Sequence, residues 1–477
     1  MNSYYGSRQP FVGRKTTAVQ RFRYVFLGIA AILAAIVAAF EQYGTLTTTQ
    51  ADYALLIFVL GLFPAFVGVT SHREIKLMPL MPLHGFFYAL TFGLPTFSAK
   101  TEWRSNSASL DDALMLTLGG LFVLYLGYYF SRPLFAKIKP IEFLSGVPDS
   151  IQRRSAWILL VLYLLFILAP VIMKIPSVGQ LTAPLGYVST GLLLTLSLDG
   201  RLSRQQFIVF TCVLVFILLD RTLTGSLAHT GAYLIFFGII LWQKRHVLPK
   251  KLIAATVIFI FIFNPVKFKY REYTWWSPQG SEISYTDKIS LFYEATIDTY
   301  TGGSFFDYVS SDPGTVNRLA HIATFAYVIN LTPRVVPYWM GGSYETLWTS
   351  FIPRILWPGK PVGTIGNIFG KRYYLLNQQD SSTSFNLPWL IEFYANFGIM
   401  GVFLGMFGVG LLFRFLVQKF SVDPSRRIEY VLGISIIFSL WYAESNFSLM
   451  AGGILLTYFS FVILLKLLPA LSRKRTF

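Results

Sequence analysis

Long apolar runs separated by short charged stretches are the main pattern of this sequence. Runs of about 18 residues or more are long enough to cross a hydrocarbon core of about 30 Å as helices. These runs are continuous and do not alternate, which favours helices over a closed barrel. The pattern predicts an all-α integral membrane protein with about 12 transmembrane helices. The predicted spans are Tyr24–Phe40, Tyr53–Thr70, Pro79–Pro95, Ala113–Phe130, Ala156–Met173, Thr182–Leu198, Phe207–Leu219, Ser226–Trp242, Leu252–Asn264, Leu387–Phe413, Tyr430–Ala443 and Met450–Leu467.

The distribution of Lys and Arg predicts the orientation of these spans. Most of these residues fall in every second connection and at both chain ends, and cytoplasmic loops retain positive charge during insertion. Both termini are therefore predicted to be cytoplasmic. We divide the chain into a cytoplasmic basic arm (1–23), helices one to nine (24–264), a long extracytoplasmic, periplasmic segment (265–386), helices ten to twelve (387–467) and a cytoplasmic basic tail (468–477).

The amino-acid composition also indicates an integral membrane protein. Only 13% of the residues are charged, 54% are hydrophobic, and the mean hydropathy is +0.54. The net charge of +17 does not indicate nucleic-acid binding, because the basic residues lie between apolar runs and do not form a soluble patch. Positive loops at the inner face also attract anionic lipid headgroups. The single cysteine, Cys212, lies inside an apolar run, which excludes an intrachain disulfide.

The segment from Pro265 to Asn386 is too long for a plain connection and too apolar for a disordered one, so we expect it to be folded. Arginine binds phosphate oxygens in pairs through a planar, permanently charged group, which suits it to hold a phosphate or diphosphate. The alternative for each basic residue is a pair with a nearby carboxylate, or a place at the headgroup level. For Arg221 that alternative is an ion pair with Asp220. The favoured anion-binding residues are Arg318, Arg334, Arg354 and Lys360, and the functional alternative for Arg221 is a second contact to the same anion.

Two further residue types have both structural and functional interpretations. Glu392 lies in an apolar run, where an ionisable group is costly unless it faces protein or water, and a structural partner such as an arginine is the simpler explanation. Trp275 and Trp276 fit sugar stacking or an interfacial aromatic belt. The sequence has no HExxH, paired CxxC, EF-hand, Walker or GxSxG motif, and the long segment lacks DxD. We therefore expect no metal and no cofactor.

Two stretches resemble a known family. GTVNRLAHIATFAYVINLTPRVVPYWMGGSYETLWTSFIPRILWPGKP begins just before Arg318, and IEFYANFGIMGVFLGMFGVG contains Glu392. Together they are similar to bacterial oligosaccharide repeat-unit polymerases of the Wzy or O-antigen polymerase type, over about a third of the chain. Related polymerases and ligases often carry an arginine after a serine at the outer end of a helix, where LTGSLAHTGAY has Leu227. Arg221 is the candidate to replace it.

The resemblance implies a metal-independent glycosyltransferase of the bacterial inner membrane. It would join undecaprenyl-diphosphate-linked oligosaccharides, one as donor and one as acceptor, into O-antigen or exopolysaccharide on the outer side of the membrane. A flippase and a chain-length regulator are the implied protein partners. His321 or Glu392 would accept the hydroxyl proton. Arg318, Arg334 and Arg354 would hold the diphosphate, with Arg221, Lys360 and Arg372 as further contacts and Trp275, Trp276, Trp339 and Trp357 against the sugars.

Two alternatives remain open. An O-antigen ligase would use the same chemistry with a different acceptor, and no residue in the sequence identifies the acceptor. A transporter or flippase of the lipid-linked oligosaccharide would be expected to have inverted repeats and broken helices that meet inside the membrane. The sugars, their linkage, the stereochemical outcome and the oligomeric state are not specified by these residues.

Overall fold

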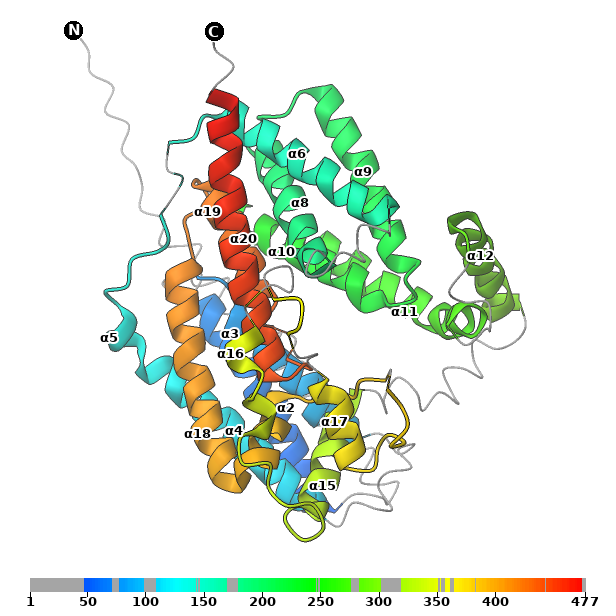
Figure 1. The fold of residues 1–477 in the computed structure, drawn as a ribbon, viewed down its shortest axis with the longest axis vertical. Helices are drawn as coiled ribbons and strands as arrows, with labels where there is room; N and C mark the ends of the chain where they lie inside the picture. Colours follow the sequence, from blue (N-terminus) through cyan, green and yellow to red (C-terminus); the bar gives the residue numbers. More distant parts are fainter. Residues whose placement is uncertain are drawn as a thin grey trace, which may run out of the picture.

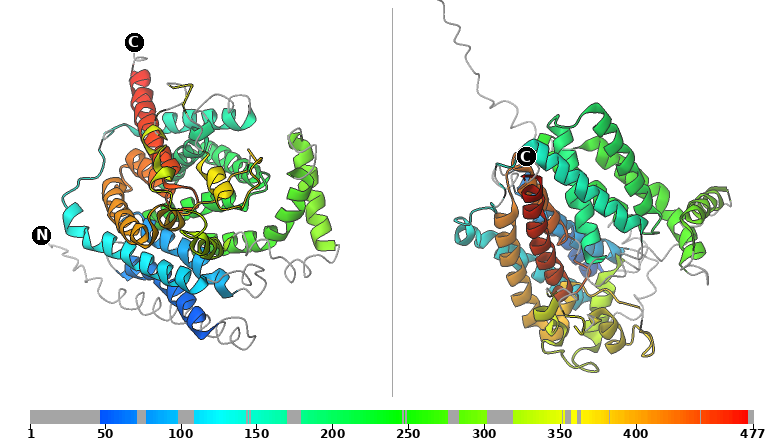
Figure 2. Two further views of the ribbon diagram at one scale, coloured as in Figure 1. Left: turned by 60° about the horizontal axis from the view of Figure 1, so that its bottom comes forward. Right: turned by 45° about the horizontal axis from the view of Figure 1, so that its top comes forward.

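The computed structural model describes residues 47–70, 77–97, 109–169 (except 143 and 145), 179–275 (except 246 and 248), 283–301, 319–350, 352, 357–360 and 364–473 (except 382 and 442). Within these ranges the secondary structure is helical, with no strand. The elements, shown in Figures 1 and 2, are α2 (Thr48–Thr70), α3 (Leu80–Tyr88), η2 (Ala89–Gly93), η3 (Leu94–Phe97), α4 (Leu110–Phe130), α5 (Arg132–Phe135), α6 (Asp149–Leu168), η5 (Gly179–Leu181), α8 (Thr182–Leu198), α9 (Arg204–Thr222), α10 (Leu227–Arg245), α11 (Lys250–Thr274), α12 (Tyr285–Thr301), α15 (His321–Leu331), η6 (Gly342–Tyr344), α16 (Leu347–Ser350), α17 (Ile365–Arg372), α18 (Trp389–Phe420), α19 (Arg427–Phe438) and α20 (Phe447–Arg473).

Seven helices of the described part are long and apolar enough to cross a membrane: α2, α4, α6, α9, α11, α18 and α20. Every predicted span within the described residues has a helical counterpart, and α8 has the predicted bounds Thr182–Leu198. The first predicted span, 24–40, lies outside the described residues. The all-helical class predicted from the apolar runs is confirmed.

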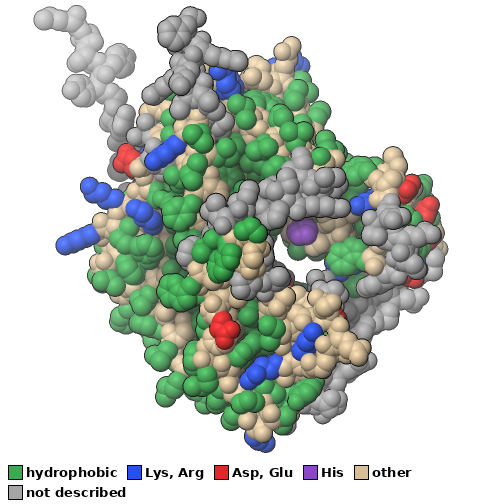
Figure 3. Space-filling model, in the orientation of Figure 1, with side chains coloured by type: hydrophobic (Ala, Val, Ile, Leu, Met, Phe, Trp, Pro, Cys, Tyr) green, Lys and Arg blue, Asp and Glu red, His purple; other side chains and the backbone are tan. Residues whose placement is uncertain are grey.

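The surface of the molecule is apolar to a degree that lipid would explain. Hydrophobic side chains cover much of the face in Figure 3. Phe130 and Leu404 are 74% and 72% exposed, and many other large apolar side chains are exposed with them. Water-soluble monomers rarely expose apolar patches of this extent. Helices satisfy their own backbone groups, so a helical surface of this kind is compatible with a lipid solvent.

Small residues allow the central helices to pack closely. A Cβ on Gly410 of α18 would lie 2.2 Å from the carbonyl oxygen of Leu124, and a Cβ on Gly127 of α4 would lie 2.4 Å from that of Phe407. Glycine at both positions therefore lets the α4 and α18 backbones touch, as small residues do between membrane helices. Glycine also allows close packing of α2 on α3 at Gly61, where a Cβ would lie 2.6 Å from the Gly85 backbone oxygen.

Helix α18 corrects the prediction of one continuous tenth span over Leu387–Phe413. The chain reverses at Gly398, whose φ of 63° and ψ of −147° are not helical. Residues 389–397 fold back against residues 399–420: the rings of Trp389 and Phe413 lie 5.9 Å apart, and a Cβ on Gly401 would lie 2.3 Å from the Phe393 oxygen. The apolar run is therefore a helical hairpin, which hydropathy alone cannot distinguish from one long helix.

Two findings change the prediction for the segment 265–386. Helix α11 does not end at Asn264 but continues through Pro265 to Thr274. Helix α15, inside the same segment, belongs to the main hydrophobic core, with Ile322, Phe325 and Val328 fully buried among α4 and α18 residues. A segment predicted to be folded outside the membrane thus contributes one helix to the interior of the bundle, because the buried face of α15 is as apolar as its neighbours.

Ion pairs join four of the connections that the charge pattern predicts to be cytoplasmic. Arg427 bonds Asp149 at 2.8 Å and also pairs with Asp199, and Lys244 bonds Asp199 at 2.9 Å. Arg201 bonds Asp149 at 3.0 Å. Since these residues lie at or next to the ends of α6, α8, α10 and α19, those four helix ends gather at one face of the bundle.

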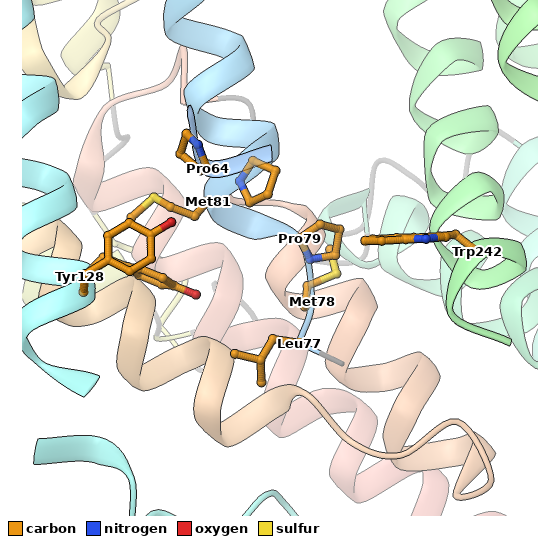
Figure 4. A pocket seen from close by; sticks show the side chains of 9 residues that line it. Pro64, Leu77, Met78, Pro79, Met81, Tyr128 and Trp242 are labelled. Atoms are coloured by element: carbon orange, nitrogen blue, oxygen red, sulfur yellow. The ribbon is translucent and has the colours of Figure 1, made fainter. Parts of the chain in front are cut away.

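An apolar pocket lies near this face, between α2, α3, α4 and α10 (Figure 4). Figure 4 shows Met78, Met81, Tyr128 and Trp242 around it. Its lining residues in the described part of the chain are uncharged, and none of them belongs to the predicted site.

Candidate functional site

Three helix starts converge inside the bundle: α15 begins at His321, the first arm of α18 at Trp389, and α20 at Phe447. The rings of Trp389 and Phe447 lie 5.3 Å apart. His321 lies beside the middle of the helical run 80–97, with its ring 6.0 Å from Phe87 and 6.1 Å from Phe92. Helix starts present unpaired N–H groups and partial positive charge, so this region can compensate buried carboxylates.

Glu392 is completely buried in the first turn of α18. One carboxylate oxygen accepts a hydrogen bond from Ser343 Oγ at 2.7 Å, and the other accepts one from the Phe447 backbone N–H at 2.7 Å. These partners are a hydroxyl and a helix N-terminus, and neither is the arginine expected for a structural role. With both oxygens occupied and no exposure, the carboxylate holds η6, α18 and α20 together.

Asn396 completes this network one turn later on the same helix. Its Nδ2 donates to Ser343 Oγ at 2.9 Å and to the Glu392 backbone oxygen at 2.7 Å, while its Oδ1 accepts from the Gly341 N–H at 2.9 Å. Burial raises the pKa of the neighbouring Tyr344 phenol, and the negative charge of Glu392 raises it further. The phenol therefore stays protonated. The hydrogen bonds among Glu392, Ser343 and Asn396 hold these three side chains in one geometry.

His321 is held by a second carboxylate. Its Nε2 lies 3.0 Å from Glu444 Oε1, and the other oxygen of Glu444 accepts from Asn386 Nδ2 at 2.9 Å. His321 is 4% exposed, and the side chain of Glu444 is 14% exposed. With the proton on Nε2, the imidazole donates to Glu444 and carries its lone pair on Nδ1. A carboxylate that orients an imidazole in this way is the arrangement of a general base.

Two predicted cations gather at the other end of α15. Arg372 Nη2 donates to the Pro337 oxygen at 2.6 Å, and its guanidinium lies 5.4 Å from the centre of the Trp339 ring. Arg334 is exposed in the turn that follows α15. Since α15 is 11 residues long, these groups lie about 16 Å from His321 along the helix. The structure therefore brings Arg372 and Trp339 together and places Arg334 in the same connection, but none of the three lies against His321.

Arg221 and Trp275 lie elsewhere, on the α9–α11 side of the molecule (Figure 1). Arg221 Nη2 bonds Asp220 Oδ2 at 2.7 Å, which is the ion pair considered as its alternative role. Trp275 follows α11, is 51% exposed, and stacks on the buried Arg271 at 4.2 Å. Neither residue joins the predicted group around α15.

The other predicted residues are only partly described. Lys360 Nζ donates to the backbone oxygens of Ser350 and Ile352 at 3.0 Å each, beside α16, and Trp357 is 39% exposed. Arg318, Arg354 and Trp276 lie outside the described residues.

The pairings that define this region were not predicted from the sequence. Glu444 lies 123 positions from its partner His321. The partners of Glu392 are Ser343, 49 positions away, and Asn396, 4 positions away. Only the last spacing is a local signal, because residues i and i+4 share a helix face. Glu444 had a weaker signal, since a carboxylate just after a predicted span needs a partner.

The comparisons place the chain in one family. No curated protein and no solved structure matches it. A family model described as a domain of unknown function, DUF8712, matches residues 149–473, a region that includes His321, Glu392 and Glu444 and covers more than half of the chain. The chain belongs to the DUF8712 family.

Proposed function

We propose that this chain is an inner-membrane glycosyltransferase that polymerises undecaprenyl-diphosphate-linked oligosaccharide units on the outer side of the membrane. About 12 spans with cytoplasmic termini remain the proposed topology. It is supported by the helical counterparts of the predicted spans and by the ion pairs that gather the predicted inner loops at one face. The resemblance of the stretches around Arg318 and Glu392 supports the reaction class.

The observation that carries the proposal is the pair His321–Glu444. In the proposed reaction an acceptor hydroxyl attacks the anomeric carbon of the donor sugar. The new carbon–oxygen bond forms as the bond to the diphosphate oxygen breaks, and the diphosphate leaves with the bonding electrons. His321 Nδ1 takes the hydroxyl proton, and Glu444 stabilises the imidazolium through its bond to Nε2. Glu392, with both oxygens occupied, positions the surrounding helices.

The leaving diphosphate requires fixed cations. Arg318, three positions before His321 in the sequence, is the proposed partner of the diphosphate, and Arg354 remains a proposed second one. Arg334 and Arg372, with Trp339 beside Arg372, are proposed to contact a more distant part of the substrate, since α15 separates them from His321. Arginine stacked on an aromatic ring presents both a charged edge and an apolar face, which suits a phosphate next to a sugar.

The test uses purified protein in nanodiscs with a lipid-linked repeat unit, and products are separated by length. His321→Gln should lower the rate by about 10² to 10⁴, the usual contribution of a general base. Glu444→Gln should lower it less and shift the pH profile. The matched controls are His229→Gln, on α10 and bonded to Thr224, and Glu345→Gln, an exposed carboxylate. Normal chain lengths from His321→Gln at normal abundance would overturn the assignment.

Transport of the lipid-linked oligosaccharide is the second candidate, because the structure contains the broken helices expected of transporters. The α18 hairpin turns at Gly398, and α15 and α20 begin inside the bundle. Proteoliposomes separate the two functions. A transporter moves a labelled lipid-linked unit across the bilayer without changing its mass, whereas a polymerase joins units on one side. Transfer onto a lipid A core in the same assay would identify a ligase.

A further inference from the structure

Helix α12 has three distinct faces. Ala295 and Thr299 are buried, and the Phe292 ring packs 5.7 Å from Phe263 and 5.4 Å from Tyr270, so one face rests on α11. The acidic residues Asp287, Glu294 and Asp298 share a second face. At 100° per residue, a third face, here called the α12 stripe, contains Ile289, Tyr293, Ile297 and Tyr300, which are 50%, 65%, 39% and 43% exposed.

The contacts of α12 with α11 show which way these faces point. Tyr300, from the α12 stripe, donates its hydroxyl to the Ile262 backbone oxygen, whereas Asp298, from the acidic face, accepts from the Tyr273 hydroxyl. Ile262 and Tyr273 are about 16 Å apart along α11. Helix α12 therefore crosses α11, as Figures 1 and 2 show at the far end of α11. Its stripe faces the apolar part of α11, and its acidic face points toward the charged end.

Helix α12 crosses α11 at the point where the surface of α11 changes from apolar to charged. Before it, Val257, Ile258 and Phe261 are 61%, 57% and 64% exposed, and this surface is part of a proposed span. After it, Lys267 and Lys269 begin a charged stretch. The α12 stripe thus continues the exposed apolar surface of α11 at the level where that surface ends, and tyrosine is enriched at this depth of a bilayer.

We propose that α12 lies parallel to the bilayer at its extracytoplasmic surface. The α12 stripe is inserted into the acyl–headgroup boundary, and the carboxylates of α12 point toward water. The occupant of the stripe is lipid. An amphipathic helix of this kind gains binding energy from buried apolar area, while its polar face stays hydrated. The inference rests on the proposed membrane placement of α11. It adds a membrane-surface helix at the end of α11, and this helix sets the height of α11 in the bilayer.

Single-cysteine variants in purified nanodiscs of phosphatidylethanolamine and phosphatidylglycerol test the proposal, in a Cys212→Ala background, since Cys212 is the free, exposed cysteine. The readout is the rate of modification by a charged, water-soluble maleimide. Tyr293→Cys and Ile297→Cys should react at least about tenfold more slowly than Glu294→Cys and Asp287→Cys. An apolar environment raises the thiol pKa, and each unit removes about nine-tenths of the reactive thiolate. Neighbouring positions 293 and 294 form the matched pair.

A control on α11 separates the possible failures. If Val257→Cys is protected but positions 293 and 297 react as fast as 294, the α12 proposal is wrong and the membrane placement stands. If Val257→Cys is itself fast, the placement of α11 fails. Protection of positions 293 and 297 in native membranes but not in nanodiscs would show that a protein partner, and not lipid, covers the α12 stripe, and would overturn the assignment.

Discussion

Replacing Glu392 by alanine tests whether this carboxylate is structural or chemical. The change removes the acceptors of two buried donors, Ser343 Oγ–H and the Phe447 N–H, both at 2.7 Å. Each buried donor left without a partner costs about 1 to 3 kcal/mol, so Glu392→Ala should lose about 2 to 6 kcal/mol of unfolding free energy. Glu392→Gln should lose less, because the amide oxygen keeps one bond and the amide carries no charge to desolvate.

The measurement is reversible unfolding in mixed micelles of sodium dodecyl sulfate and a non-ionic detergent, followed by tryptophan fluorescence. Glu345→Ala is the matched control, since Glu345 is an exposed carboxylate just after η6. It should unfold like the wild type. If Glu392→Ala also unfolds like the wild type while polymerisation is abolished, the structural role is refuted and the carboxylate acts on substrate.

Two further predictions concern the hairpin turn and the inner ion network. Gly398→Ala should cost about 1 to 3 kcal/mol, because a side chain is strained at this φ and ψ, and its Cβ would lie 2.8 Å from Tyr338 Oη. Gly408→Ala in the same helix is the control, since a Cβ there meets nothing within 4 Å, and equal unfolding of the two variants would contradict the strain. Partial burial raises the pKa of the Asp199 carboxyl, but the hydrogen bonds from Lys244 and Arg427 outweigh it and hold the pKa below 3.8. The stability that ionised Asp199 provides is therefore present above pH 3.8 and lost as pH falls through the lower folded-state pKa. Asp199→Asn should remove this acid-dependent loss, and an unchanged pH profile of unfolding would contradict it.

The helical class follows from the sequence because each apolar run must satisfy its own backbone in lipid. The bounds of α8 could be predicted for this reason. The need of Glu392 for a polar partner could be inferred because an ionisable group among apolar residues is costly without one. These inferences depend on local composition, which the sequence displays directly. His321 is a candidate only through the family resemblance.

Tertiary structure decided the partners and the path of the chain. The reversal at Gly398 is invisible to hydropathy, since both arms of α18 are apolar. The pairing of His321 with Glu444 joins positions 123 apart, and no periodicity links them. The described arginines of the predicted group are divided between the end of α15 and the α9–α11 side, because like charges along a sequence do not determine which helix ends meet. Residue type thus fixed which groups need partners, whereas packing of the helices selected those partners.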